Sequence, residues 1–303
     1  MSSNRIASEE YSGGQSPPEP APPPHPLIEV EGLRALRDES WRLLDCRFDL
    51  EDPEWGRRVY RESHIPGASY VGLERDLSGS LTGENGRHPL PEISELEALF
   101  SRLGIGSHNH VVAYDASGGP YAARAWWTLR YLGHDLVQVL NGGFPAWQRA
   151  ELPTESGENS VPSADFVADP RPEMRAPLDE IRSSLNQAQV QLIDARAPER
   201  YRGEQEPYDP VAGRIPGALN HHWKENLGAR GEFLPPSKLH QKIRGSLQGK
   251  VDGEHISYCG SGVTAAHNIL ALRAAGLPEP RLYVGSWSEW CADDDRPIER
   301  NGG

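Results

Sequence analysis

Short apolar runs alternate with amphipathic segments along most of this 303-residue chain. The runs at residues 110–114 and 137–140 have the length of buried strands, and residues 121–132 have helical spacing that stops at Gly133. Helices between short buried strands are typical of an open, mostly parallel sheet. The pattern therefore predicts an α/β fold whose ligands bind at the carboxyl ends of the strands.

The same pattern returns in the second half of the chain, with predicted strands at 255–258 and 281–284 and a predicted helix at 264–275. Four landmarks recur in the same order, between 143 and 150 residues later: LLDCR (43–47) as LIDAR (192–196), HIPGA (64–68) as RIPGA (214–218), VAYD (112–115) as ISYC (256–259), and NGG (141–143) with Trp147 as VGS (284–286) with Trp290. A repeat of this length indicates a duplicated domain rather than a short-period solenoid.

We expect two α/β domains, 28–150 and 174–303, each an open, mostly parallel sheet flanked by helices. A polar, proline-rich linker is predicted at 151–173. Residues 1–27 contain the run SPPEPAPPPHP and are predicted to be a disordered tail, because they have little to bury.

The composition of the chain argues against several classes of protein. The net charge of −13 argues against sequence-independent nucleic-acid binding. No apolar stretch approaches the ~20 residues that span a bilayer, and the first residues lack a signal-peptide pattern, so we expect no membrane association. Three cysteines are too few for a disulfide scaffold and fit a cytoplasmic protein. Scattered histidines predict no metal site, and the absence of a glycine-rich nucleotide motif predicts no cofactor.

One equivalent position differs in chemical kind between the two copies: Cys259 stands where the first copy has Asp115. Cys259 opens the loop CGSGVTA, in which Gly260 and Gly262 allow backbone N–H groups to turn toward the sulfur. Those amides, with the positive end of the following helix, would stabilise a thiolate and the extra sulfur of a persulfide. Because Asp115 cannot carry sulfur, the first copy is predicted to be catalytically silent.

Two other roles are possible for a cysteine at this position. A lone cysteine is often a buried structural thiol, the role we expect for Cys46 and Cys291, which lack such a loop. A phosphate-binding loop needs Cys-x5-Arg, and here Ala265 stands in place of the arginine. The loop therefore favours sulfur chemistry over phosphate chemistry.

These residues resemble the tandem rhodanese family of sulfurtransferases. The resemblance runs from about Leu27 to the C-terminus and includes both Ile-Pro-Gly-Ala turns, the Gly-Gly-x-x-x-Trp ending and the cysteine loop. CGSGVTA is similar to the active loop of 3-mercaptopyruvate sulfurtransferases, whereas thiosulfate-specific members carry basic residues there, as in CRKGVT. An uncharged loop favours a thiol-bearing organic acid, because a compact dianion benefits from a nearby cation.

The resemblance also implies roles for individual residues. Cys259 would attack the sulfur of a small donor, and a thiol, cyanide or a thioredoxin-like reductant would take the sulfur from the resulting persulfide. Ser261, His88 and Glu74 match the residues that assist this chemistry in the family. Substrate would be bound by the loop residues and by an arginine: Gly260, Gly262, Val263, Thr264 and Arg200.

One position departs from the family. The second substrate arginine of the family follows Glu-Pro, but here Tyr208 follows Glu206-Pro207, and its hydroxyl could supply an uncharged hydrogen bond. Arg196 and Arg202 are candidate substitutes, although Arg196 is expected to pair with a structural acid. This departure leaves thiosulfate open as the donor. A persulfide carrier with little turnover and a scaffold with an unreactive Cys259 are the alternatives outside small-donor catalysis.

Overall fold

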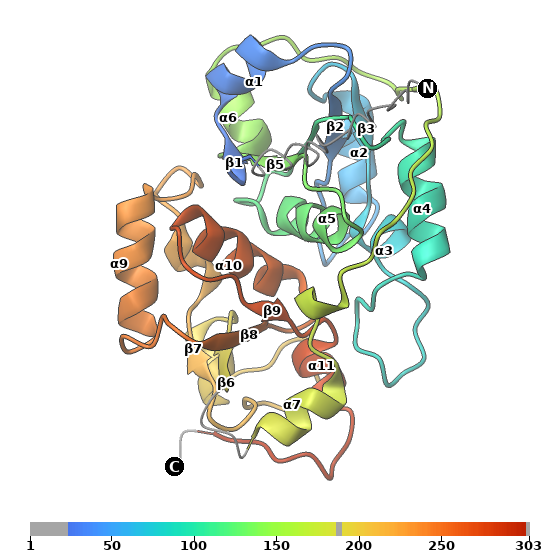
Figure 1. Cartoon of the computed structure of the whole chain (residues 1–303). Helices are drawn as coiled ribbons and strands as arrows, with labels where there is room; N and C mark the ends of the chain where they lie inside the picture. Colours follow the sequence, from blue (N-terminus) through green and yellow to red (C-terminus); the bar gives the residue numbers. More distant parts are fainter. Residues whose placement is uncertain (1–23, 186–189, 301–303) are drawn as a thin grey trace, which may run out of the picture.

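The computed structural model describes residues 24–185 and 190–300. It contains two parallel sheets, one in each half of the chain, with helices on both faces (Figure 1). The predicted α/β fold is therefore confirmed. Most of the predicted tail, residues 1–23, lies outside the described residues.

The first sheet has the order β1-β5-β4-β2-β3, and all of its pairings are parallel. Its strands are β1 (Leu27–Ile28), β2 (Arg42–Asp45), β3 (Ala68–Tyr70), β4 (Val111–Tyr114) and β5 (Val137–Leu140). The helices of this half are α1 (Val30–Leu36), α2 (Trp55–Glu62), α3 (Leu73–Asp76), α4 (Ile93–Arg102), α5 (Pro120–Tyr131) and α6 (Gly143–Arg149). We call this half the first domain.

The second sheet has the order β7-β6-β8-β9, again with parallel pairings throughout. Its strands are β6 (Val190–Asp194), β7 (Leu219–Asn220), β8 (Glu254–Tyr258) and β9 (Arg281–Leu282). The helices of this second domain are α7 (Leu178–Ser184), α8 (Pro198–Arg202), α9 (Pro236–Ser246), α10 (Val263–Ala274) and α11 (Ser286–Trp290), with short 3-10 helices at η1 (Pro172–Met174) and η2 (Trp223–Asn226).

Residue alternation along each strand divides the core into layers, because neighbouring side chains point to opposite faces. In β2, Leu43 packs with α1, α2 and α6, while Leu44 packs with α4 and α5. In the second domain, β6 alternates in the same way: Leu192 faces α7 and α11, and Ile193 faces α9 and α10.

The two domains share one of these layers. Helices α5 and α10 pack against each other between the sheets, and the buried side chains of both belong to one continuous apolar cluster (Figure 1). Small residues such as Ala122 and Ala266, both fully buried, allow the close approach. The carboxyl ends of β2 and β8 are consequently brought to one interface.

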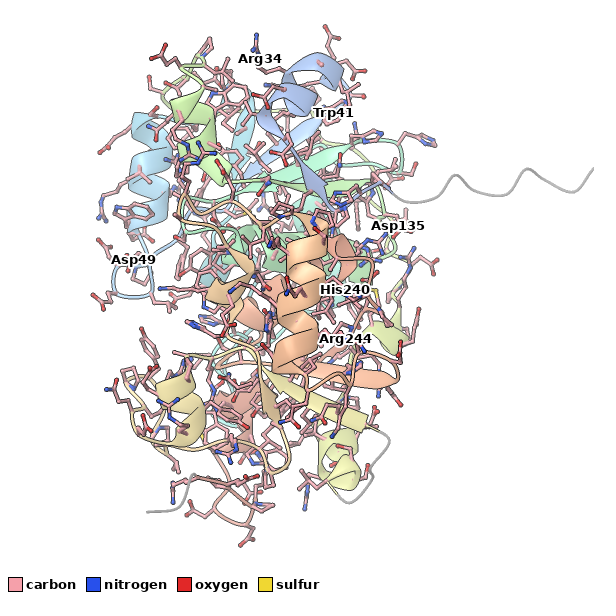
Figure 2. The ribbon with its side chains drawn as sticks, turned by 90° about the vertical axis from the view of Figure 1, so that its left-hand side faces the viewer. Arg34, Trp41, Asp49, Asp135, His240 and Arg244 are labelled. Atoms are coloured by element: carbon pink, nitrogen blue, oxygen red, sulfur yellow. The ribbon has the colours of Figure 1, made fainter. Side chains whose placement is uncertain are left out.

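The surroundings of this interface are visible from the side. Helix α9, on which His240 and Arg244 are labelled, lies on the outside of the second domain, while the loop that carries Asp49 leaves the end of β2 (Figure 2). The segment between α6 and η1 follows the first domain and is pinned to it by paired backbone hydrogen bonds between His64 and Glu155. Within residues 24–185 and 190–300, no helix is long and apolar enough to cross a membrane.

Candidate active site

Cys259 lies at the carboxyl end of β8, directly before the loop that opens α10. Gly262 adopts a left-handed φ of 78° and ends that loop, a conformation that favours glycine. Helix α11 holds the loop from below: Cys259 N–H donates to Ser286 Oγ at 3.1 Å, and Trp287 N–H donates to the Cys259 carbonyl at 2.9 Å. The position of the cysteine is thus fixed by its neighbouring turn.

A cavity of about 430 Å³ opens above this loop, between the two domains. Cys259 lines it although only 2% of the residue is exposed, and the other loop residues that line it are Gly260, Ser261, Val263 and Thr264. The first domain contributes Arg87, His88 and Tyr121, and the second contributes Arg200 and Tyr208. Residues about 170 positions apart in the sequence therefore meet at one site, a consequence of the shared α5–α10 layer.

The equivalent loop of the first domain shows what its backbone can hold. The carboxylate of Asp115 accepts four backbone N–H groups, from Ser117 at 2.8 Å, Gly119 at 2.9 Å, Tyr121 at 2.9 Å and Ala122 at 3.1 Å. Converging amides at a helix start form an anion-binding nest. The same offsets from Cys259 fall on Ser261, Val263, Ala265 and Ala266. The first copy therefore carries its own anion where the second copy carries a thiol.

His88 reaches the cysteine loop from the first domain. Its Nδ1 lies 2.7 Å from Ser261 Oγ, within hydrogen-bonding distance. Burial, followed by the charges of Arg124 and Arg87, lowers the pKa of His88 to about 3. The imidazole is consequently neutral at physiological pH, able to accept a proton in a hydrogen bond at one nitrogen and donate from the other.

Arg124, on α5, lies fully buried beneath the same loop. It donates from Nη2 to the His88 carbonyl at 3.0 Å and from Nη1 to the Gly262 carbonyl at 3.4 Å, whereas its Nε has no partner among the described residues. Burial lowers the pKa of Arg124 to about 10, so the side chain remains charged at neutral pH. A cation is therefore buried beside the cysteine loop.

Two further arginines lie on the cavity side of the loop. An ideal Cβ built on Gly260 would lie 2.7 Å from Arg87 Nη2 and 3.3 Å from Arg200 Nη2. Both guanidinium groups also lie over the ring of Tyr208, at 5.7 Å for Arg87 and 5.0 Å for Arg200. A side chain at 260 would therefore displace the ends of these two arginines.

Buried carboxylates hold the two arginines in place. Glu206 accepts from Arg200 Nε at 3.0 Å and from its Nη2 at 2.6 Å. Asp209 bridges the pair, with one oxygen on Arg87 Nη1 and the other 3.2 Å from Arg200 Nη2. Burial raises the pKa of Asp209, while the two arginines act in the opposite direction.

The remaining predicted residues have structural partners or lie outside the Cys259 cavity. Arg196 forms an ion pair with Asp194 at 2.6 Å, and the equivalent Arg47 does the same with Asp45, which confirms a structural acid as the partner of Arg196. Glu74 does not line the Cys259 cavity: it is exposed on α3 and borders a different hollow with Pro91. Its proposed role therefore rests on the resemblance alone. Arg202 pairs with Glu204 at 2.6 Å, away from the cavity.

Sequence analysis missed Arg87, Arg124 and Asp209. Arg87 adjoins His88, and that adjacency was the available signal, since neighbouring residues of one loop reach the same cavity. Nothing in the local pattern distinguishes Arg124 from the surface arginines of an amphipathic helix.

Among the residues that the structure describes, no group of three or more His, Cys, Asp or Glu side chains could hold a metal ion.

Comparison with known proteins finds similar sequences over both domains. The model of the rhodanese-like domain matches twice, over residues 30–150 and 177–293. A relative from Pseudomonas aeruginosa, provisionally named a 3-mercaptopyruvate sulfurtransferase, is 50% identical over 275 residues, which cover 90% of this chain and 97% of the relative. A Mycobacterium tuberculosis relative, provisionally named a thiosulfate sulfurtransferase, is 40% identical over 85% of this chain and 90% of its own.

A solved structure is similar over the whole described fold. The 3-mercaptopyruvate sulfurtransferase from Leishmania major superposes with a TM-score of 0.81 at 30% identity, covering 91% of this chain and 78% of the Leishmania chain. The similarity spans both domains, so it includes the interface at which Cys259 lies.

Proposed function

This chain belongs to the rhodanese family of tandem-domain sulfurtransferases, and on that premise we propose that Cys259 carries the transferred sulfur as a persulfide. The observation that supports this role most strongly is the position of Cys259. It is the cysteine that lines the interdomain cavity, whereas Cys46 and Cys291 do not line it. Burial raises the pKa of Cys46 and also raises that of Cys291, to about 11, which suits structural thiols.

The first half-reaction moves sulfur from donor to cysteine. We propose 3-mercaptopyruvate as the preferred donor, a thiol that carries a ketone and a carboxylate. The Cys259 thiolate forms a bond to the donor sulfur, and the donor C–S bond breaks with its electron pair going to carbon. The resulting enolate takes one proton, so a thiol and 3-mercaptopyruvate become a persulfide and pyruvate without any external oxidant.

Ser261 and His88 are suited to handle that proton. With the proton of neutral His88 on Nδ1, the imidazole donates to Ser261 Oγ across 2.7 Å and leaves the hydroxyl proton free for the substrate. The hydroxyl can then give its proton to the enolate carbon and take the Nδ1 proton, while Nε2 takes up a proton from solvent. Glu74 is proposed as a further assisting acid from the resemblance, although it is exposed on α3.

The second half-reaction passes the outer sulfur to an acceptor. A thiol attacks it and leaves with a persulfide of its own, while Cys259 returns to the thiol. Cyanide or a thioredoxin-like reductant would serve in the same way. We place this reaction in the cytoplasm, where the three cysteines, all free in the structure, would stay reduced.

Local charge favours a donor with a single negative charge. The guanidinium groups of Arg87, Arg196 and Arg200 are matched by the carboxylates of Asp194, Glu206 and Asp209. Arg124, beneath the loop, has no carboxylate partner among the described residues, which leaves one positive charge uncompensated. A dianion added to this partly buried cluster would be less well compensated than a monocarboxylate. Thiosulfate remains the second candidate donor, favoured by the provisional name of the M. tuberculosis relative.

The test combines intact mass with kinetics. Mixing the protein with 3-mercaptopyruvate should add ~32 Da at Cys259 and release one pyruvate; Cys259→Ser should do neither, whereas the matched control Cys291→Ser should do both. The ratio of kcat/KM for 3-mercaptopyruvate to that for thiosulfate should exceed one. A Cys259→Ser protein with wild-type turnover would refute the role of the cysteine, and loading only from a protein donor would identify a carrier instead.

A further inference from the structure

The cavity is lined by an arginine, Arg87, to which the sequence analysis assigned no role. Position 208, two residues after the Glu206 that holds Arg200, is occupied by a tyrosine, so the second domain supplies one guanidinium group near Gly260. The structure supplies another from the opposite domain: Arg87 lies beside Arg200 over Gly260.

The hydrogen bonds of the two arginines leave particular nitrogen atoms unused. Arg87 donates to Asp209 from Nη1, and Arg200 donates to Glu206 and Asp209 from Nε and Nη2. Arg87 Nη2 and Arg200 Nη1 have no acceptor among the described residues, and these atoms approach the Cβ position of Gly260 to 2.7 Å and 3.5 Å. Two free donors therefore converge beside the residue that follows Cys259.

The backbone around Arg87 is positioned by the second domain. Gly86 has a φ of +81°, and a Cβ there would lie 2.7 Å from the Gly285 carbonyl, so the two chains are in close contact. Arg87 N–H donates to Ser288 Oγ, on α11, at 3.0 Å. The guanidinium group is thus delivered by a loop docked on the helix that also supports Cys259.

We propose that Arg87 is a specificity-determining residue that binds the donor's carboxylate together with Arg200. This inference rests on the proposed sulfur transfer through Cys259 and deepens it by assigning the recognition of a monocarboxylate to a cross-domain arginine pair. Asp209 positions both guanidinium groups, and the ring of Tyr208 provides the surface on which they rest. The free Nη2 and Nη1 atoms would each donate one hydrogen bond to a carboxylate oxygen.

A purely structural Arg87 would leave a different pattern. Neutralising Asp209 requires only Nη1 of Arg87. That role alone does not explain why Nη2 lies beside Arg200 at Gly260. The 31% exposure of the Arg87 side chain is consistent with a donor that water occupies until a ligand replaces it.

The test uses two donors that differ only in the carboxylate. Mercaptoacetone has the thiol and ketone of 3-mercaptopyruvate with a methyl group in place of the carboxylate. For Arg87→Gln, we expect kcat/KM with 3-mercaptopyruvate to fall about 10- to 100-fold, mostly through KM, because a charge-assisted hydrogen bond is lost. With mercaptoacetone, the rate of persulfide formation should change by less than about threefold, because no carboxylate is present to lose its partner.

Matched variants complete the design. Arg202→Gln removes a partly exposed arginine on α8, the helix that also carries Arg200, and should change the rate with neither 3-mercaptopyruvate nor mercaptoacetone. Arg87→Lys should recover part of the loss, since it keeps the charge without the fork. Gly260→Ala should raise KM for 3-mercaptopyruvate by displacing the end of Arg87. Thermal unfolding of each variant checks that the fold persists.

The outcomes separate this inference from the proposed function. An equal loss with both donors, or no loss with 3-mercaptopyruvate, would overturn the role of Arg87 while leaving sulfur transfer intact. Failure of the wild-type protein to form a persulfide with either donor would instead overturn the proposed function. A loss confined to 3-mercaptopyruvate would support the arginine pair.

Discussion

His88 Nδ1 lies 2.7 Å from Ser261 Oγ, so a side-chain hydrogen bond joins the first domain to the cysteine loop of the second. The two residues are 173 positions apart in the sequence. The bond is buried, and the His88 carbonyl is held at the same time by Arg124. The domain that has Asp115 in place of the loop cysteine therefore contributes directly to the site.

This bond predicts an unusual pH dependence. Because burial holds the pKa of His88 at about 3, the imidazole stays neutral between about pH 5 and 8. The rate of persulfide formation should show no inflection near 6.5 due to this residue, and His88→Gln should be slower by about tenfold or more across that range. Stopped-flow measurement of pyruvate release would check it. A wild-type inflection near 6.5 that vanishes in the variant would contradict the prediction.

Asp115 should contribute strongly to stability. Its carboxylate satisfies four backbone N–H groups in a site where the residue is only 1% exposed. Asp115→Ala leaves those donors without an acceptor and should lower the free energy of unfolding by about 2–4 kcal/mol. Urea denaturation measures this, with the exposed Asp49→Ala as control. An unchanged midpoint would mean that water replaces the carboxylate without cost.

His267 should make the protein sensitive to acid. It is fully buried on α10, and burial lowers its pKa from 6.5 to about 3. Between these values the unfolded chain binds a proton that the folded protein excludes, so stability decreases as the pH falls below 6.5. His267→Gln should reduce the slope of unfolding free energy against pH by about 1.4 kcal/mol per pH unit in that window.

The matched control for His267 is His240→Gln, at a partly exposed position on α9. Unfolding curves recorded at several pH values should give the control the wild-type slope. If His267→Gln also keeps that slope, then the buried imidazole is protonated in the folded protein and the prediction is wrong.

Arg124 should increase the reactivity of Cys259 toward electrophiles. Its charge is buried beneath the cysteine loop, and a negative charge on Cys259 in turn favours the protonated guanidinium. Arg124→Met should therefore slow alkylation of Cys259 by iodoacetamide at neutral pH by about 3- to 10-fold. Arg130→Met, on the same helix but paired with Glu279, serves as control. Equal alkylation rates in all three proteins would show that the cation does not act on the sulfur.

Local sequence patterns predicted the elements that position the site. The helices expected at 121–132 and 264–275 are α5 (Pro120–Tyr131) and α10 (Val263–Ala274), each shifted by one residue. They were predictable because helical spacing and a terminal glycine are local signals. The placement of Cys259 at a strand end follows from the same local reading.

Long-range placement was not predictable in the same way. The pairing of Arg87 with Asp209 joins residues 122 positions apart, and it depends on how the loop before His88 docks on α11. Glu74 and Arg87 are similarly far from Cys259 in the sequence, yet Glu74 lies on α3 and is exposed to solvent. A single sequence records neither path, because loop conformation is set by contacts with the other domain.

The apolar layer between α5 and α10 makes the stability of each half of this duplicated chain depend on the other half. Cutting the chain between α6 and η1 and separating the halves would expose an apolar surface on each to water, so neither half should be stable by itself. The first domain has Asp115 where the second has Cys259, yet it cannot be removed without exposing the apolar face of α10. Its packing alone therefore gives the second domain a reason to keep it.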